Sequence, residues 1–417
     1  MSQKVKIGVF GAGRGKSMID VLAKHPDAEL VAVCDKYAPL LEPIRKISEE
    51  INKPIFVYQE FDEFVKHDMD AVILANFAHE HAPYAIKLLN AGKHVMSEVL
   101  PTETMAQAVE LVEAVEKSGK IYAYAENYCY MDQTFEMQRR YQNGEIGEAL
   151  YLESEYLHDC SRDWPGLTYG DKEHWRNLLY STFYCTHSVG PLLTITGLRP
   201  VSVVGFETPK NPKEAFLGRK SGFAGGMEVI TLENKAIAKS IHGGLKREPA
   251  VTNFDIYATD GNMETNGKMI DMYIEKKGSV ARGVNSSFEP EKFISPDLAK
   301  NFGGHGGSDF YATHFFIEKI LGREDGKFSI DIYTALDMSF CGIMAYRSIL
   351  AGNQPMAIPN FRNKEEREPF RHDNKCTNTA IASGDDLLPC HSSGDFEISD
   401  DEYEKVKELW LAGKKAE

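Results

Sequence analysis

Basic residues are in short supply in this 417-residue chain, with 47 Lys and Arg against 62 Asp and Glu. The formal net charge of −15 argues against a nucleic-acid-binding protein, which needs a basic face for phosphates. Long hydrophobic runs are also missing: none reaches the roughly 20 residues of a membrane-spanning helix. The sequence therefore predicts no nucleic-acid or membrane partner, and a small molecule as the ligand.

Cysteine is sparse as well, and no CxxC pair occurs. The seven residues stand far apart, at positions 34, 129, 160, 185, 341, 376 and 390. An odd number at such spacings excludes a disulfide framework and a zinc ribbon. The first residues, MSQKVKIGVFGAG, enter a strand pattern directly, with no apolar leader segment before it. We therefore expect a cytoplasmic protein.

What the first part of the chain does have is an alternation of strand-like and helical patterns. This alternation continues to about residue 125 and is typical of βαβ units around a parallel, doubly wound sheet. The strand-like runs are residues 4–10, 28–34, 71–74, a run from about 94, and 121–124. The clearest helix is residues 102–119, where Thr102 is placed to cap the start and Gly119 to close the end.

The sequence pattern changes after residue 125. Strand-like runs at 149–157 and across 201–275 follow one another with turns such as Asp260-Gly261, which indicates a second, mostly antiparallel open sheet. Further helices are expected at 332–350 and 400–411, with a polar, irregular stretch between them. The predicted fold is α/β, with a dinucleotide-binding domain at 1–125, a substrate-binding and oligomerisation domain at 126–360, and an extension at 361–417 packing on the second domain.

A glycine-rich turn follows the first strand. Gly11, Gly13 and Gly15 flank Ala12 and Arg14, where a tight turn lets backbone N–H groups and a helix N-terminus face a pyrophosphate. Asp35, at the end of the second strand, is placed to accept hydrogen bonds from the adenosine ribose and to repel a 2′-phosphate. The pattern predicts NAD rather than NADP, although Lys36 beside Asp35 leaves NADP open.

The next segment resembles a known family. Asn76-x-x-x-x-His81, followed by AIKLLNAGKHVMSEV at 85–99, is similar to the Gfo/Idh/MocA family of glucose–fructose oxidoreductase and inositol dehydrogenase. In that family this stretch lines the nicotinamide and ends in a Glu-Lys-Pro motif whose lysine touches the sugar. This chain has Glu98-Val99-Leu100, so the lysine of an ordinary dehydrogenase is missing.

The substitution is shared with the NAD-dependent enzymes of glycoside hydrolase family 109, and further motifs resemble that branch in order. They are Glu126-Asn127-Tyr128-Cys129-Tyr130, Tyr156-Leu157-His158-Asp159, Trp175-Arg176, the run from Tyr184 through His187 to Pro191, and Gly304-His305-Gly306-Gly307-Ser308-Asp309-Phe310. The broad family resemblance covers most of residues 4–355. It implies an N-terminal Rossmann domain, a second α/β domain with an open sheet, and a homodimer or homotetramer.

The resemblance also implies a reaction on a carbohydrate. A pyranoside is oxidised at C3, loses a proton at C2, eliminates its C1 substituent, takes up water and is reduced again. By this analogy Tyr184 and His187 act at the reacting carbons, with Glu126 and His158 as further acid/base groups. Two residues would hold sugar hydroxyls, Tyr156 and Arg176. Those placed at the cofactor are Gly11, Gly13, Arg14, Gly15, Asp35, Asn76, His81, Glu98 and Asn127.

Other interpretations of the same residues stay open. A sugar or cyclitol dehydrogenase without net hydrolysis fits the fold and the glycine turn equally well. A dinucleotide sensor would keep Asp35 but would not need the pair Tyr184 and His187. The i, i+2 pairs His158 with Cys160 and Cys185 with His187 have no recognised zinc spacing, and the resemblance implies no metal.

Overall fold

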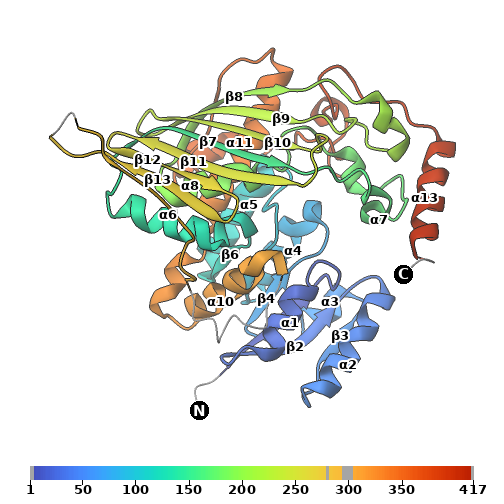
Figure 1. Cartoon of the computed structure of the whole chain (residues 1–417). Coiled ribbons are helices and arrows are strands. Elements are labelled where there is room, and N and C mark those ends of the chain that lie inside the picture. The colour runs from blue at the N-terminus through green and yellow to red at the C-terminus, as the bar shows by residue number, and fades with distance from the viewer. Residues whose placement is uncertain (1–3, 279–280, 294–303, 415–417) are drawn as a thin grey trace. The chain divides into compact units, whose positions relative to one another are not determined.

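The computed structural model of the chain describes residues 4–278, 281–293 and 304–414 (Figure 1). The chain divides into two compact units that interleave along the sequence. The first comprises Met1–Asp132, Lys292–Leu336 and Asn360–Asp373, and the second Gln133–Glu291, Asp337–Pro359 and Asn374–Glu417.

This division differs from the contiguous domains expected from the sequence. Residues 292–336, expected in the second domain, belong to the first unit, where helix α10 (Ser308–Ile320) packs against α1 (Lys16–Lys24). The segment Asn360–Asp373 also belongs to the first unit, because Arg367 forms an ion pair with Glu116 at 2.6 Å. Only the part of the extension after residue 373 is assigned to the second unit.

The first unit is built on a parallel sheet of six strands in the order β3-β2-β1-β4-β5-β6. Its strands are β1 (Val5–Phe10), β2 (Ala28–Cys34), β3 (Phe56–Tyr58), β4 (Ala71–Leu74), β5 (His94–Ser97) and β6 (Tyr122–Tyr124). Nearly continuous apolar runs such as β1 and β4 are buried on both faces, as parallel strands between helical layers require. The order reverses between β1 and β4, which is where doubly wound sheets bind ligands. The predicted α/β fold is confirmed.

The helices of the first unit are α1, α2 (Glu42–Glu50), α3 (Phe61–Phe64), α4 (His81–Asn90), α5 (Met105–Ser118), α10 and α12 (Lys364–Arg367). Helix α5 ends at Gly119, as predicted, with a positive φ of 62°. The predicted cap was wrong: Thr104, not Thr102, accepts the hydrogen bond from the Gln107 N–H at 3.1 Å, because the helix begins three residues later than expected.

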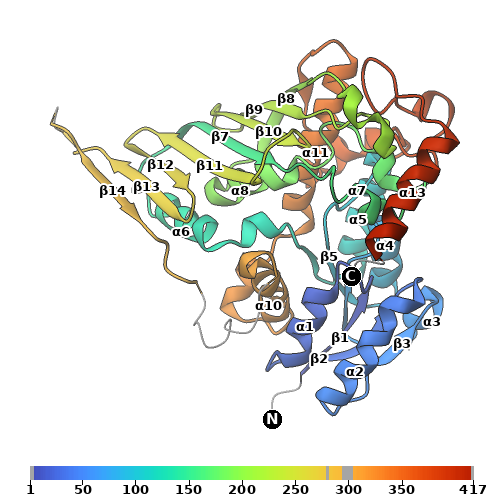
Figure 2. The same cartoon turned by 45° about the vertical axis from the view of Figure 1, so that its right-hand side comes forward.

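The second unit contains a nine-stranded sheet in the order β14-β13-β12-β11-β7-β10-β9-β8-β15 (Figure 2). Its strands are β7 (Ala149–Leu157), β8 (Pro200–Glu207), β9 (Gly226–Leu232), β10 (Ile237–Gly243), β11 (Val251–Ala258), β12 (Gly261–Asn266), β13 (Met269–Ile274), β14 (Val284–Phe288) and β15 (Met356–Ala357). Only β7 and β10 pair in parallel; the other neighbours are antiparallel. This confirms the mostly antiparallel second sheet.

One face of this sheet is covered by helices. Helix α8 (Thr186–Thr196) packs on β7, β10 and β11. Gly205 of β8 lies so close to Ala345 of α11 (Ile332–Leu350) that an added Cβ would meet the Ala345 carbonyl oxygen at 2.2 Å. The opposite face keeps half-exposed side chains such as Tyr151, Glu153 and Lys239, so the strands alternate between a covered and an open side.

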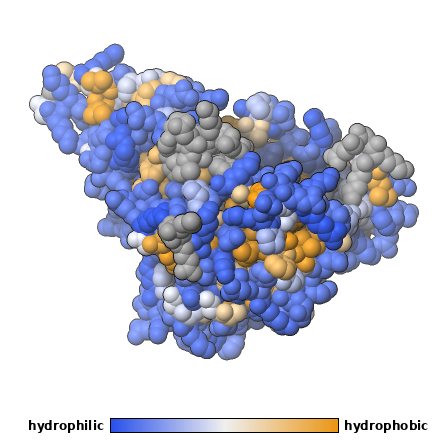
Figure 3. Space-filling model, turned by 90° about the horizontal axis from the view of Figure 1, so that it is seen from below, coloured by the Kyte–Doolittle hydropathy of each residue, from blue (hydrophilic) through white to orange (hydrophobic). Residues whose placement is uncertain are grey.

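The extension after residue 373 is irregular until helix α13 (Asp400–Lys414). It packs beside α7 (Trp164–Thr168), and the Tyr403 hydroxyl donates to the Gly218 carbonyl at 3.0 Å. The remaining helix of this unit, α6 (Asp132–Gln142), starts at the boundary between the two units. No helix in the described ranges is long and apolar enough to cross a membrane. Hydrophilic residues dominate the face shown in Figure 3, as expected for a chain with 26% charged residues.

Candidate active site

The glycine turn after β1 has the geometry that a dinucleotide needs. Gly11 has a φ of 99°, and an added Cβ would lie 2.4 Å from the Ala75 carbonyl carbon. A Cβ at Gly15 would lie 2.3 Å from the Gly11 carbonyl oxygen. Gly13 is exposed, and its nearest neighbour would be a Leu40 methyl at 3.5 Å. The turn is thus closed on the protein side and open at Gly13, a shape that fits a pyrophosphate at the start of α1.

Asp35 lies beside this turn. Its carboxylate accepts hydrogen bonds from the Ala12 N–H at 2.7 Å and from the Tyr37 N–H at 2.8 Å. Lys36, which left NADP open, forms an ion pair with Glu80 at 2.9 Å. The lysine is therefore engaged elsewhere, and the negative Asp35 is the group that would face the adenosine ribose.

Replacing Asp35 with serine should change the cofactor preference. We expect NADH to bind roughly tenfold more weakly, because hydrogen bonds to a charged acceptor are lost. NADPH should bind more tightly, because the repulsion of its 2′-phosphate is removed. Titration of both nucleotides by fluorescence measures the two affinities, with exposed Asp62→Ser as the control. An unchanged ratio of the two affinities would contradict the placement of Asp35 at the ribose.

The residues expected near the nicotinamide hold one another through backbone contacts. His81 is buried, and its ring nitrogens face the carbonyls of Leu100 at 2.9 Å and Asn76 at 3.2 Å. Burial lowers its pKa to about 4, so the ring is neutral at physiological pH. Asn76 in turn donates to Glu80 at 3.2 Å. His81 thus positions this segment, and the contacts of Asn76 and His81 with NAD remain predictions.

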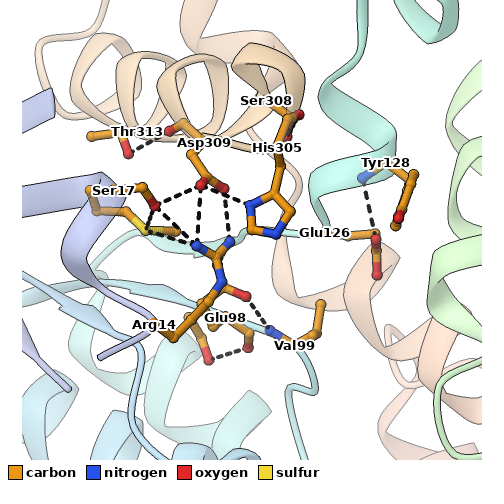
Figure 4. A network of polar contacts seen from close by, with 12 residues as sticks. Arg14, Ser17, Glu98, Val99, Glu126, Tyr128, His305, Ser308, Asp309 and Thr313 are labelled. Atoms are coloured by element: carbon orange, nitrogen blue, oxygen red, sulfur yellow. Dashed lines mark hydrogen bonds and ion pairs between the residues drawn. The ribbon is translucent and has the colours of Figure 1, made fainter. Parts of the chain in front are cut away.

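Arg14 connects the glycine turn to a buried carboxylate from a distant part of the chain (Figure 4). Its guanidinium donates to Asp309 at 2.8 and 3.1 Å and forms an ion pair with Glu98 at 2.5 Å. Asp309 also accepts from the Ser17 hydroxyl at 2.6 Å and contacts His305 Nδ1 at 3.0 Å. These five side chains connect the glycine turn to the start of α10.

The pKa values of the two acids in this network, Asp309 and Glu98, shift in opposite directions. Burial would raise the pKa of Asp309, but hydrogen bonds from His305, Arg14 and Ser17 hold it well below its usual range. Burial raises the pKa of Glu98, and the charge of Arg14 opposes that effect. The Asp309 carboxylate is therefore ionised at neutral pH. The motif Gly304–Phe310 is recognisable in the sequence, but nothing in its pattern signals that Asp309 and Ser17 meet at the cofactor turn.

Two further residues of the first unit lie at the end of β6. Glu126 is fully buried and accepts a hydrogen bond from the Tyr128 N–H at 3.3 Å, at the start of the short helix η3 (Asn127–Tyr130). Asn127, the first residue of that helix, is 7% exposed. The carboxyl end of a parallel strand is the usual place for functional side chains in such sheets. Their roles as acid/base group and nicotinamide contact stay predictions.

In the second unit, five predicted residues form one cluster. Tyr156 lies near the end of β7, and its hydroxyl is hydrogen-bonded to His158 Nδ1 at 3.1 Å. His187, in the first turn of α8, packs edge-on against Tyr156 with ring centroids 4.7 Å apart. The ring of Tyr184 stacks on His187 at 5.5 Å, and Arg176 donates to the Tyr184 hydroxyl at 3.0 Å. The spacing of Tyr184 and His187 therefore does bring them together.

The electrostatics of this cluster suit proton transfer. Burial raises the pKa of Tyr184, while the positive charge of Arg176 lowers it. Arg176 is itself fixed by stacking over the Trp175 ring, with its Cζ 4.6 Å from the centroid. The hydroxyl of Tyr184 thus has a fixed donor that would stabilise its ionised form, and His187 is only 8% exposed. Among the described residues no group of three His, Cys, Asp or Glu side chains could hold a metal ion.

Comparisons with known proteins match one segment in each part of the chain. Residues 5–126 match the model of the oxidoreductase family with an NAD-binding Rossmann fold, and residues 234–366 match the model of the glycosyl hydrolase 109 C-terminal domain. The two segments are thus similar to these two domain families. The predicted resemblance is thereby confirmed, and NAD is the cofactor of the first domain.

Relatives with similar sequences extend over most of the chain. The glycosyl hydrolase family 109 protein 1 of Bacteroides thetaiotaomicron is 23% identical over 399 residues, covering 86% of this chain and 85% of its own. The glycosyl hydrolase family 109 protein of Porphyromonas gingivalis is 24% identical over 413 residues, covering 89% and 87%. These matches indicate an enzyme of the NAD-dependent oxidoreductase or glycoside hydrolase type.

Solved structures share the fold. A levoglucosan dehydrogenase in complex with NADH and L-sorbose superposes with a TM-score of 0.67 at 15% identity, over 86% of this chain and 100% of that one. An NAD-binding oxidoreductase from Klebsiella pneumoniae gives a TM-score of 0.70 at 15% identity, over 85% and 99%. The architecture is therefore shared with sugar-acting and other NAD-binding oxidoreductases. An NAD-dependent glycosidase and a sugar oxidoreductase both fit this family background.

Proposed function

We propose that the protein is an NAD-dependent glycosidase that cleaves a pyranoside by transient oxidation at C3. The observation that carries the proposal is the cluster of Tyr184, Arg176 and His187 beside the Tyr156–His158 pair. It supplies several proton-transfer groups in a chain that has Val99 where a dehydrogenase of this family has its lysine. Support also comes from the curated relatives, which are named glycosyl hydrolase family 109 proteins.

The proposed roles follow from the chemistry of each group. When bound, NAD⁺ accepts a hydride from C3 of the sugar and returns it at the end of the cycle, so no net oxidation occurs. Tyr184, whose oxygen is held by Arg176, and His187 exchange protons with the C3 hydroxyl and C2. Loss of the C2 proton expels the C1 substituent, which takes a proton from an acid such as His158 or Glu126. Water then adds at C1 as C2 is protonated again.

The cofactor side is proposed to depend on the first unit. The glycine turn and the start of α1 would hold the pyrophosphate, and Asp35 the adenosine ribose. Glu98 and Asn127 would contact the nicotinamide end. Tyr156 and Arg176 would hold sugar hydroxyls, as a guanidinium fork grips neighbouring oxygens.

Self-association is part of the same proposal. The open face of the nine-stranded sheet carries half-exposed or exposed apolar side chains, among them Met227, Val229, Ile237 and Ile241. Pairing of two such faces in a homodimer or homotetramer would remove this apolar surface from water.

Proton NMR of a glycoside panel in D₂O, with enzyme and catalytic NAD, tests the reaction. Deuterium at C2 of the released sugar without net NADH is the expected result. Cleavage without C2 exchange would overturn the oxidation–elimination route. A 3-keto product that accumulates with equal NADH would make the protein a sugar or cyclitol dehydrogenase. No reaction with any substrate, together with tight NAD binding, would favour a dinucleotide sensor.

A further inference from the structure

A second arginine lies beside the cluster around Tyr184. Arg219 stands between the short helix η5 (Pro212–Leu217) and β9, and only 7% of it is exposed. Its Nε donates to the Ser221 hydroxyl at 3.0 Å, and its Cζ lies 5.3 Å from the Trp164 ring centroid and 5.0 Å from that of Phe223. Within the ranges that the structure describes, no carboxylate forms an ion pair with Arg219.

Arg176 likewise has no carboxylate ion pair in the described part of the chain. Its contacts are with the Tyr184 hydroxyl and the Trp175 ring, and no described carboxylate pairs with it. The two arginines act on the same groups: both lower the pKa of Tyr184 and of the Cys160 thiol, against the larger raising effect of burial. Burial, with a smaller contribution from Arg176, lowers the pKa of Arg219 to about 10. The Arg219 guanidinium is therefore charged at neutral pH.

Three other buried or half-buried arginines do have carboxylate partners: Arg14 has Asp309, Arg199 has Asp337 at 3.2 Å, and Arg367 has Glu116 at 2.6 Å. A buried charge without a counter-ion is costly.

Two acids near this cluster are already paired with a lysine. Asp159 is one residue from Cys160, and it pairs with Lys246 at 3.1 Å. The same lysine pairs with Glu214 of η5 at 2.6 Å. Neither carboxylate is therefore available to neutralise the two guanidiniums. A bound anion would supply the counter-charge that Asp159 and Glu214 do not provide.

We infer that Arg176 and Arg219 form an anion subsite for a carboxylate on the substrate. This inference rests on the proposed function and narrows its substrate to pyranosides that carry a carboxylate, with hexuronides as the simplest class. A planar guanidinium matches a carboxylate through paired hydrogen bonds, whereas a hydroxyl would leave the charge uncompensated, so the carboxylate replaces the hydroxyls proposed above as the partner of Arg176. The contact of Arg176 with Tyr184 places this subsite next to the groups proposed to act on C2 and C3.

Equilibrium binding tests the subsite without requiring turnover. In calorimetric titrations of the NAD-loaded protein, D-glucuronate and D-galacturonate should bind roughly 10- to 100-fold more tightly than D-glucose and D-galactose. Arg219→Met should remove most of this preference, and Arg219→Lys should keep part of it. The exposed Arg162→Met is the matched control and should keep the whole preference. Thermal unfolding of each variant verifies that it is folded.

Two results would overturn the inference. One is equal binding of uronates and hexoses by the wild-type protein. The other is an equal loss of both ligands in a folded Arg219→Met, which indicates a structural role only. Hexose 6-phosphates in the same titration show whether another anion is preferred, and a preference for them would replace the carboxylate. Tight uronate binding without cleavage of any uronide would defeat the proposed glycosidase and leave the subsite standing, whereas cleavage of neutral glycosides without uronate binding would do the reverse.

Discussion

Replacing His187 with alanine is expected to lower kcat by about 1,000-fold, because a positioned acid/base group contributes factors of this size. His187 lies in the first turn of α8, and its ring contacts both Tyr156 and Tyr184, at 4.7 and 5.5 Å between centroids. Alanine removes the imidazole from the centre of the cluster and leaves the hydrogen bond from Arg176 to Tyr184 in place. NAD affinity should be unchanged, since the glycine turn belongs to the first unit.

Steady-state cleavage of the best glycoside of the panel measures the loss. Added imidazole should restore part of the activity of His187→Ala, because a small base can enter the space of the missing side chain. The exposed His372→Ala is the control, and it should behave as wild type with and without imidazole. Full activity of a folded His187→Ala would exclude His187 from the chemistry. Loss of activity with no imidazole rescue and a large fall in Tm would assign His187 a packing role.

Local patterns were sufficient for the elements around the cofactor. The alternation of short apolar runs with helical patterns predicted β1, β2, β4, β5 and β6, and the runs of β1 and β2 end directly at Gly11 and Asp35. The glycine turn was also predictable, since Gly11 and Gly15 occupy positions where an added Cβ would meet backbone atoms within 2.4 Å. The nine-stranded sheet followed from consecutive strand-like runs, although the parallel pairing of β7 with β10 did not.

Contacts between distant parts of the chain were not predictable. Arg14 and Asp309 are 295 residues apart, and neither a helix nor a strand pattern signals that they meet. The pairing of Lys36 with Glu80 depends in the same way on how the loops after β2 and β4 converge. The domain boundaries also departed from a simple division, because α10 belongs to the first unit although it lies in the chain between β14 and β15 of the second unit's sheet.

The cluster around Tyr184 and His187 was predictable in part. Tyr156 and His158 are two residues apart, and Tyr184 and His187 three, so each pair could be proposed from the sequence. Their convergence was inferred by resemblance to a family, and within the second unit the structure brings these residues together. Arg219 could not be singled out from the sequence, because a lone arginine in an irregular segment belongs to no motif. Its burial and its lack of a carboxylate partner among the described residues are known only from the structure.

Asp309→Asn is expected to destabilise the first unit by about 3 kcal/mol, because removing one partner of a buried ion pair leaves the other charge uncompensated. Asp309 is 2% exposed and receives hydrogen bonds from Arg14 and Ser17. Asparagine keeps the size of the side chain but not its charge, so Arg14 would retain only Glu98 as an anionic partner. The glycine turn would lose its fixed position, and NADH should bind roughly tenfold more weakly if this costs about 1.4 kcal/mol.

The destabilisation should depend on pH in a defined direction. The pKa of Asp309 in the folded chain lies below its usual value of about 3.9. At a pH between these two values, the unfolded chain therefore binds a proton at this residue and the folded chain does not. The stabilising effect of the ionised carboxylate is fully present above that usual value and is lost as pH falls towards the folded pKa. The difference between wild type and Asp309→Asn should therefore be constant from pH 7 to about pH 5 and narrow below about pH 4.

Urea unfolding of the two proteins at a series of pH values, followed by hydrogen exchange of the first unit, measures this difference. The exposed Asp385→Asn is the matched control, since it removes one carboxylate without a buried partner, and its curve should follow wild type throughout. A difference that grows as pH falls would contradict the lowered pKa of Asp309. A difference near zero at pH 7 would show that Arg14 finds another partner, and the glycine turn would then be fixed by its own backbone contacts with Ala75 and Gly11 rather than by α10.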